Sequence, residues 1–145
     1  MIAISIGRRL LTRQGEAVEP LNLESVRAAT DVLDRHFAAL NAGDAAALTQ
    51  TLHFPHYRLA GVRMQVWERP ESYLDDFRAR AGSDWHHSAW DFRNAVASSG
   101  DKVHFDAQFT RYRADGSVLG RYRTLWVVSR IDGRWAAQLR STFAG

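Results

Sequence analysis

The strongest constraint on the fold lies in the second half of the chain, where long alternating runs are separated by two-residue turns. Two of these turns are Asp-Gly pairs, Asp115-Gly116 and Asp132-Gly133, and a third is Ser99-Gly100. Asp-Gly between alternating runs is a strong hairpin signal, because a tight hairpin turn needs residues that tolerate positive φ. The turns therefore predict an antiparallel meander of four strands, at residues 85–98, 101–114, 117–131 and 134–143.

Counting outward from two-residue turns predicts which residues face each other across the meander. The predicted neighbours are Phe105, Trp126 and Leu139, then Phe109, Tyr122 and Phe143, and then Val103, Val128 and Ala137. On the preceding strand, the same face would carry Trp90, Phe92, Asn94 and Val96. Because this face is nearly all apolar, we expect the helices to cover it.

The opposite face of the predicted sheet is polar around an apolar centre formed by Leu125 and Val127. Its polar members are Asp91, Arg93, His104, Asp106, Gln108, Arg121, Arg123, Gln138 and Arg140. In this register Arg93 faces Asp106, and both Arg123 and Arg140 point outward. An apolar centre among charges is typical of a subunit interface. We therefore predict a homodimer through this outer sheet face, with the outward arginines in ion pairs.

Three helices are expected before the meander. Residues 21–44 have the apolar spacing of an amphipathic helix, with Asn22 placed to cap its start and Gly43 to end it. Asp44 is expected to cap a short helix over residues 45–52, and the third helix runs from Pro70 to Gly82.

Two short strands, at residues 56–61 and 62–70, are predicted between the second and third helices. Residues 1–21 are expected to form a tail or an extended segment outside a single domain of residues 22–145.

Composition excludes several classes of function. The chain has no cysteine, so disulfides and thiolate metal sites are excluded, and a reducing cytoplasm is the default expectation. No segment approaches the roughly 20 apolar residues needed to cross a bilayer. The net charge is only +3, Lys102 is the only lysine, and the arginines are scattered. We therefore expect neither a membrane nor a nucleic acid as partner.

The order of elements, with the segments "ALNAGDAAAL" and "VVSRIDGRW", resembles the NTF2-like superfamily, which includes SnoaL-like cyclases and ketosteroid isomerases. The resemblance covers residues 22–144. It implies an α+β cone, in which three N-terminal helices pack on a curved antiparallel sheet of about six strands. It also implies an apolar pocket at the open end of the cone and dimerisation through the outer sheet face.

The catalytic residues of the ketosteroid isomerases do not transfer to this chain. Asp44 matches their "NAGD"-type segment in letters, but it has the position of a helix cap. The first helix offers His36 and Phe37 where those enzymes have a tyrosine, and the predicted inner face of the sheet holds no carboxylate. Steroid isomerase chemistry is therefore not expected.

The segment "HFPHYRLAG" holds the candidate catalytic residues, His53 and His56. Either imidazole could move a proton near neutral pH in a cofactor-independent lyase, isomerase or cyclase. Alternatively, His53 lies beside the last carbonyls of a helix and His56 packs where a strand begins. Pro55 breaks helical spacing between them, and His86 and His87 would point to opposite faces of a strand. We therefore predict no metal site and no cofactor.

The predicted ligand-binding residues are aromatic or polar side chains of the inner face and the first strand pair. They are Tyr57, Trp67, Trp90, Asn94, Tyr122, Thr124 and Trp126. Small residues at Ala107, Gly120 and Ala137 would leave room for a cavity. The sequence favours a binding protein for a small hydrophobic or polyketide-like molecule. The alternatives are the histidine-dependent enzyme described above and a dimerisation module without a ligand.

Overall fold

The computed structural model describes residues 10–11, 17–18 and 20–144. Two short strands, β1 (Leu10–Leu11) and β2 (Ala17–Val18), pair with each other in an antiparallel manner. Most of the predicted tail, residues 1–21, lies outside the described residues.

Three helices form, the first two at the predicted caps and the third beginning three residues after the predicted start at Pro70. They are α1 (Leu23–Ala42), α2 (Ala45–Gln50) and α3 (Tyr73–Ala81). The Asn22 side chain accepts from the Ser25 N–H at 3.1 Å, and the Asp44 side chain accepts from the Ala47 N–H at 3.0 Å. Gly43 ends α1 with a φ of 67°, a left-handed conformation that glycine adopts without steric cost. The predicted caps are therefore confirmed.

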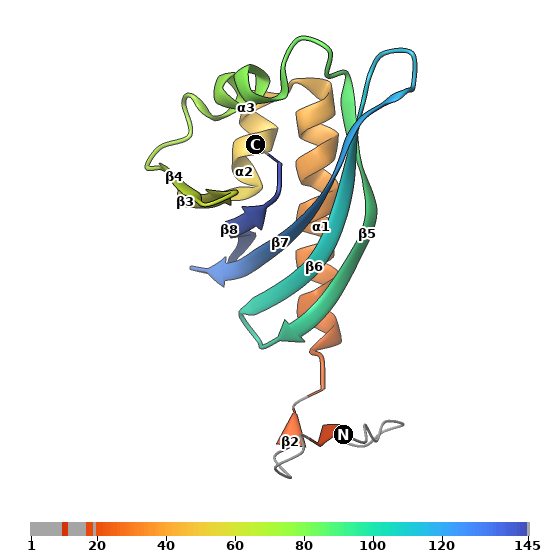
Figure 1. Cartoon of the computed structure of the whole chain (residues 1–145). Coiled ribbons are helices and arrows are strands. Elements are labelled where there is room, and N and C mark those ends of the chain that lie inside the picture. The colour runs from red at the N-terminus through yellow and green to blue at the C-terminus, as the bar shows by residue number, and fades with distance from the viewer. Residues whose placement is uncertain (1–9, 12–16, 19, 145) are drawn as a thin grey trace.

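One curved sheet of six strands wraps around α1 (Figure 1). The strands are β3 (Leu52–Ala60), β4 (Arg63–Trp67), β5 (His87–Ser98), β6 (Lys102–Tyr112), β7 (Val118–Ile131) and β8 (Arg134–Thr142). Their order is β4-β3-β8-β7-β6-β5. All neighbouring pairs are antiparallel except β3 and β8, which are parallel. The predicted α+β cone is confirmed, with one parallel pairing in a sheet that was expected to be wholly antiparallel.

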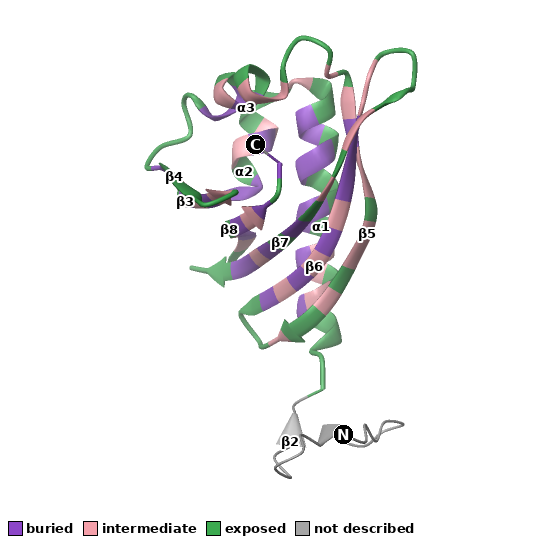
Figure 2. Ribbon diagram, viewed as in Figure 1, coloured by how far each residue is buried: buried purple, intermediate pink, exposed green. Residues whose placement is uncertain are grey.

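The register between β6 and β7 agrees with the prediction. Phe105 lies opposite Trp126, and Phe109 lies opposite Tyr122. These side chains belong to the core, which Figure 2 shows as buried segments along α1, β6 and β7. Within the described part of the chain, no helix has the length and apolar character needed to span a membrane.

The predicted register between β7 and β8 is wrong beyond Ala137. Val128 pairs with Ala137 as expected, but Val127 then pairs with Leu139, so Gln138 is an extra residue in β8. Such a β-bulge reverses the faces of the residues that follow it. Leu139 and Phe143 are therefore 40% and 79% exposed instead of buried, and Arg140 is only 6% exposed.

The predicted register of β5 is wrong for the same reason. The pairing with β6 shifts twice, first between Trp90 and Phe92 and again between Ala95 and Ala97. Phe92 and Asn94 therefore pair with outward residues of β6, and Val96 is exposed. The predicted pairing of Arg93 with Asp106 does not occur.

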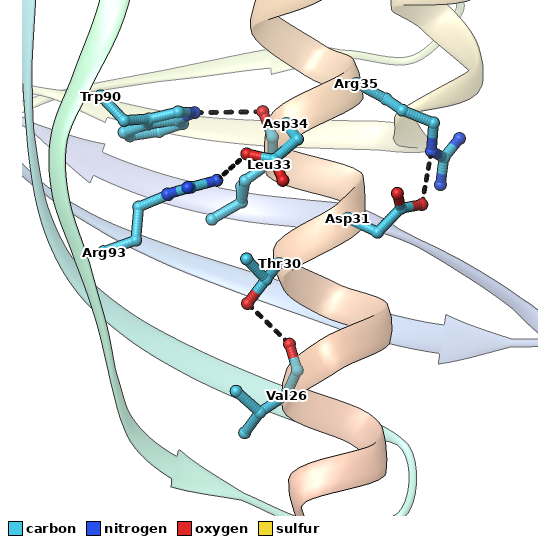
Figure 3. A network of polar contacts seen from close by, with 8 residues as sticks. All are labelled: Val26, Thr30, Asp31, Leu33, Asp34, Arg35, Trp90 and Arg93. Atoms are coloured by element: carbon cyan, nitrogen blue, oxygen red, sulfur yellow. Dashed lines mark hydrogen bonds and ion pairs between the residues drawn. The ribbon is translucent and has the colours of Figure 1, made fainter.

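The first of these shifts connects β5 to α1. Arg93 turns toward α1 and forms an ion pair with Asp34, and the Trp90 indole N–H donates to the Leu33 carbonyl at 3.1 Å (Figure 3). Asp106 pairs instead with Arg123, at 2.6 Å. The edge strand is thereby fixed over the helix, which closes one side of the cone.

Candidate functional site

A cavity of about 30 Å³ lies inside the cone. The aromatic part of its wall consists of Phe37, Tyr73, Phe77, Phe109 and Trp126. The basic part consists of His36, Arg58, Arg80, Arg111 and Arg140. Leu40, Ser88 and Thr142 complete the lining. Of these lining residues, none carries a carboxylate.

Each of the four arginines reaches the cavity from a different element. Arg58 on β3 has the same orientation as His56, two residues earlier, and both are buried. Arg111 continues the inward series of Phe105 and Phe109 on β6. Arg80 comes from the last turn of α3, and Arg140 is turned inward by the bulge in β8.

Two of the arginines have hydrogen-bond partners. Arg58 donates to the Gln65 side-chain oxygen and to the Ala144 carbonyl, both at 2.7 Å. Arg140 donates to Nε2 of His56 at 2.7 Å, and its guanidinium lies 5.0 Å from the centre of the Trp126 ring. These partners hold the two side chains in place without neutralising their charge.

The other two arginines rest mainly on aromatic rings. Arg80 lies 5.3 Å from the Trp67 ring, and Arg111 lies 5.1 Å from the Tyr122 ring. Within the described ranges, Arg80 Nε and Nη1 and Arg111 Nε are buried without a hydrogen-bond partner, as is the indole Nε1 of Trp126. In the described residues, no carboxylate lies within ion-pair distance of any of the four cavity arginines.

Burial lowers the pKa values of Arg58, Arg80 and Arg111, and the positive charge of Arg140 contributes to each. Burial, and then the positive charge of Arg140, lower the pKa of Arg58 to about 9. Burial is also the main cause that lowers the pKa of Arg80 to about 10, and it lowers the pKa of Arg111. A guanidinium with a pKa of 9 or 10 is still a cation at neutral pH. The cavity therefore concentrates positive charge.

His56 is held as a neutral imidazole beside the cavity. Its Nδ1 lies 3.1 Å from the Ala137 carbonyl, which can only accept, so Nδ1 carries the proton. Its Nε2 is then the acceptor for Arg140. Burial, and then the charge of Arg140, hold the pKa of His56 well below its ordinary range. Both ring nitrogens are in use.

His53 also donates to a carbonyl with one ring nitrogen and accepts from an arginine with the other, but it does not line the cavity. Its Nε2 donates to the Ser129 carbonyl at 2.8 Å, and its Nδ1 accepts from Arg134 at 3.2 Å. Burial lowers the pKa of His53 below its ordinary value. The imidazole thus connects β3 to the hairpin of β7 and β8.

His36, on α1, lines the cavity and contacts its aromatic side chains. Its Nδ1 donates to the Thr51 hydroxyl at 2.7 Å, because that hydroxyl gives its own proton to the Leu48 carbonyl at 2.6 Å. Its ring meets the Trp126 ring edge-on at 5.1 Å. Burial, and then the charge of Arg140, lower the pKa of His36 to about 3, so this imidazole is neutral at pH 7.

The residues predicted to bind a ligand are divided between the inside and the outside of the cone. Trp126 lines the cavity, and Trp67 and Tyr122 support its arginines. Trp90 stacks on Phe37 at 4.2 Å, and Thr124 is buried with its hydroxyl bonded to the Ser141 carbonyl at 3.0 Å.

Two of the predicted residues lie on the outer face. Asn94 is exposed there, and Tyr57 lines a surface groove with Leu59, Met64 and Leu139. The arginine lining of the cavity was not predicted from the sequence. Alternation along β6 and β3 could have placed Arg111 and Arg58 on the inner face.

The described residues contain no group of three or more histidine, cysteine, aspartate or glutamate side chains that could hold a metal ion. His36 is the one imidazole among the residues that line the cavity, and the neighbouring arginines repel a cation.

Comparison with known proteins identifies the fold through structure alone. No family model and no curated protein sequence matches the chain. A protein of unknown function with a cystatin-like fold from Nostoc punctiforme has a TM-score of 0.70 at 13% identity, covering 86% of this chain and 93% of that one. An NTF2-like protein from Novosphingobium aromaticivorans has a TM-score of 0.67 at 18% identity, covering 83% and 81%.

A ketosteroid isomerase-like protein from Erwinia carotovora has a TM-score of 0.60 at 20% identity, covering 82% of this chain and 95% of that one. The TM-scores establish a shared architecture. The sequence identities are too low to transfer an activity. The chain has the NTF2-like fold.

Proposed function

We propose that this protein binds a compact small molecule in the cavity inside the cone. The observation that carries the proposal is the indole N–H of Trp126, which is buried in the cavity wall and has no hydrogen-bond partner among the described residues. Leaving a buried donor unpaired costs about 1–3 kcal/mol. A bound molecule that accepts from this donor while packing on Phe37, Phe109 and Trp126 would recover that cost.

The size of the cavity favours a compact molecule over a polyketide-sized one. A volume of about 30 Å³ exceeds what one water molecule needs, and the aromatic side chains around it give a small apolar body a complementary surface. A larger ligand would have to displace side chains of the lining.

A role in proton transfer has less support, although one neighbour in structure is described as ketosteroid isomerase-like. His53 and His56 each use one ring nitrogen to donate to a carbonyl and the other to accept from an arginine. Neither imidazole has a free lone pair to accept a substrate proton. Their geometry supports holding the strands and Arg140 in place.

Filling the cavity is expected to abolish binding. Leu40 lines the cavity at 3% exposure, and Leu40→Phe adds volume where the wall is already closely packed. The readout is the heat of binding in titration calorimetry with small neutral acceptors, namely acetone, acetamide and isopropanol. Wild type should respond to at least one of them, and Leu40→Phe should respond to none.

Leu23→Phe is the control for this experiment, because Leu23 is 70% exposed at the start of α1 and lies outside both the cavity and the outer sheet face. It should bind like wild type. A wild type that binds nothing, or a Leu40→Phe variant with wild-type affinity and an intact circular dichroism spectrum, would contradict the proposal.

The buried histidines should make the free energy of unfolding depend on pH. The pKa of His36 is about 3 in the folded protein, whereas an unfolded chain binds the proton near pH 6.5. Stability is therefore highest above pH 6.5 and falls as the pH decreases toward 4, by at most about 1.4 kcal/mol per pH unit for each such histidine. Urea denaturation at pH 7, 6, 5 and 4 measures this slope.

His36→Gln removes one imidazole that takes up a proton on unfolding. It should therefore reduce the slope below pH 6.5 relative to wild type. Val96→Gln, at an exposed position of β5 without a titratable side chain, is the control and should keep the wild-type slope. An unchanged slope in His36→Gln would mean that His36 is not a neutral buried imidazole in the folded protein.

We also propose that the outer sheet face joins two copies of the chain. Tyr57, Leu59, Met64 and Leu139 line a groove of about 390 Å³ on this face, next to the exposed Leu125. Contiguous exposed apolar surface of this kind is typical of an interface. The outward turn of Leu139 that follows the bulge contributes to it.

Leu139→Lys should convert a dimer into a monomer, because it places a charge in the groove. Light scattering after size exclusion measures the mass. Leu23→Lys is the control, since Leu23 is also an exposed leucine but lies at the start of α1, and it should stay dimeric. A monomeric wild type at high micromolar concentration would refute the dimer.

A further inference from the structure

Among the residues that the structure describes, no carboxylate forms an ion pair with the cavity arginines. Arg58, Arg111 and Arg140 are each at most 6% exposed, and Arg80 is partly buried beside them. Buried charges in proteins are usually paired with an opposite charge or bound to a metal. Here the described surroundings supply aromatic faces, two oxygens and one imidazole lone pair, which orient the guanidiniums but leave their total charge unchanged.

Several buried donors of the cavity have no acceptor in the described part of the chain. They are Arg111 Nε, two nitrogens of Arg80 and the Trp126 indole. They come from β6, α3 and β7, so their convergence is a property of the folded cone. Guanidinium groups donate most strongly to carboxylates and phosphates, whose oxygens match the spacing of their N–H groups.

The aromatic part of the wall indicates what the acceptor is attached to. Phe37, Phe77 and Phe109 lie in the same cavity as the four cations. A bare inorganic anion would leave these rings without a partner, whereas an organic acid presents an apolar body to the rings and its oxygens to the arginines.

We infer that the cavity binds the carboxylate of a compact organic acid, held by Arg80 and Arg111 with the Trp126 indole as a further donor. This inference rests on the proposed small-molecule site and names its ligand class. The carboxylate supplies the missing negative charge and accepts from the unpartnered nitrogens.

Replacing Arg111 separates binding from stability. Arg111→Met keeps much of the length of the side chain and removes an uncompensated buried cation, so it should raise the melting temperature in the absence of a ligand. The same change should weaken carboxylate binding at least about tenfold, since a hydrogen bond to a charged group is lost. A residue with only a structural role would not combine these two effects.

The test uses titration calorimetry with acids and their neutral amides at constant ionic strength. The acids are acetate, butyrate and benzoate, the amides are acetamide, butyramide and benzamide, and sulfate represents inorganic anions. Wild type should bind at least one acid about tenfold more tightly than its amide. Arg111→Met and Arg80→Met should each lose this preference, and Arg121→Met, an exposed arginine of β7, should keep it.

Several results would overturn the inference. Equal affinity for acids and amides, or unchanged acid affinity in both Arg111→Met and Arg80→Met, would exclude the arginines as the carboxylate site while leaving a neutral small-molecule site intact. Sulfate that binds as tightly as the best acid would show that the site does not require the apolar part of an organic acid. If neither the acids nor the neutral compounds bind, both the inference and the proposed function fail.

Discussion

The repulsion among four guanidinium groups, three of them buried and Arg80 partly buried, is the interaction on which the interior of this protein depends. Arg140 is central to it, because its charge adds to burial, the main cause, in lowering the pKa values of Arg58, Arg80, Arg111, His36 and His56. Protons leave the histidines more easily than the arginines, so the imidazoles are neutral and the cations remain. His56 then accepts a hydrogen bond from Arg140, and His36 forms part of the cavity wall. The cone thus holds an excess of positive charge.

A single extra residue creates the centre of this arrangement. Without the bulge at Gln138, β8 would keep the alternation expected from the Asp132-Gly133 turn, and Arg140 would point outward. With it, Arg140 enters the cavity between His56 and Trp126, and Leu139 joins the apolar groove on the outer face. The same irregularity therefore supplies both the cation of the interior site and part of the proposed dimer surface.

The parts of the structure that depend on local sequence could be predicted, and the parts that depend on strand irregularities could not. The caps at Asn22 and Asp44 and the hairpin between β6 and β7 follow from short-range signals, and all three are present. The bulges have no such signal, because counting from a turn assumes strict alternation. Every error of face, from Asn94 to Arg140, begins at one of them.

The candidate site was predictable only in part, for the same physical reason. Alternation with Phe105 and Phe109 places Arg111 inward, so this arginine was within reach of sequence reasoning. Four arginines converge from β3, α3, β6 and β8, and that convergence is visible only in the fold. The histidines of "HFPHYRLAG" drew attention because they can titrate, but they are held neutral by burial and by neighbouring arginines.

Anomalous diffraction from crystals soaked in bromide tests the uncompensated positive charge most directly, since bromide has no chemistry beyond its charge and size. The account predicts an ordered bromide in the cavity, in contact with Arg111 and the Trp126 indole, and its loss in Arg111→Met. Bromide bound only at exposed arginines, with water in the cavity, would show that the interior does not attract anions and would contradict the account.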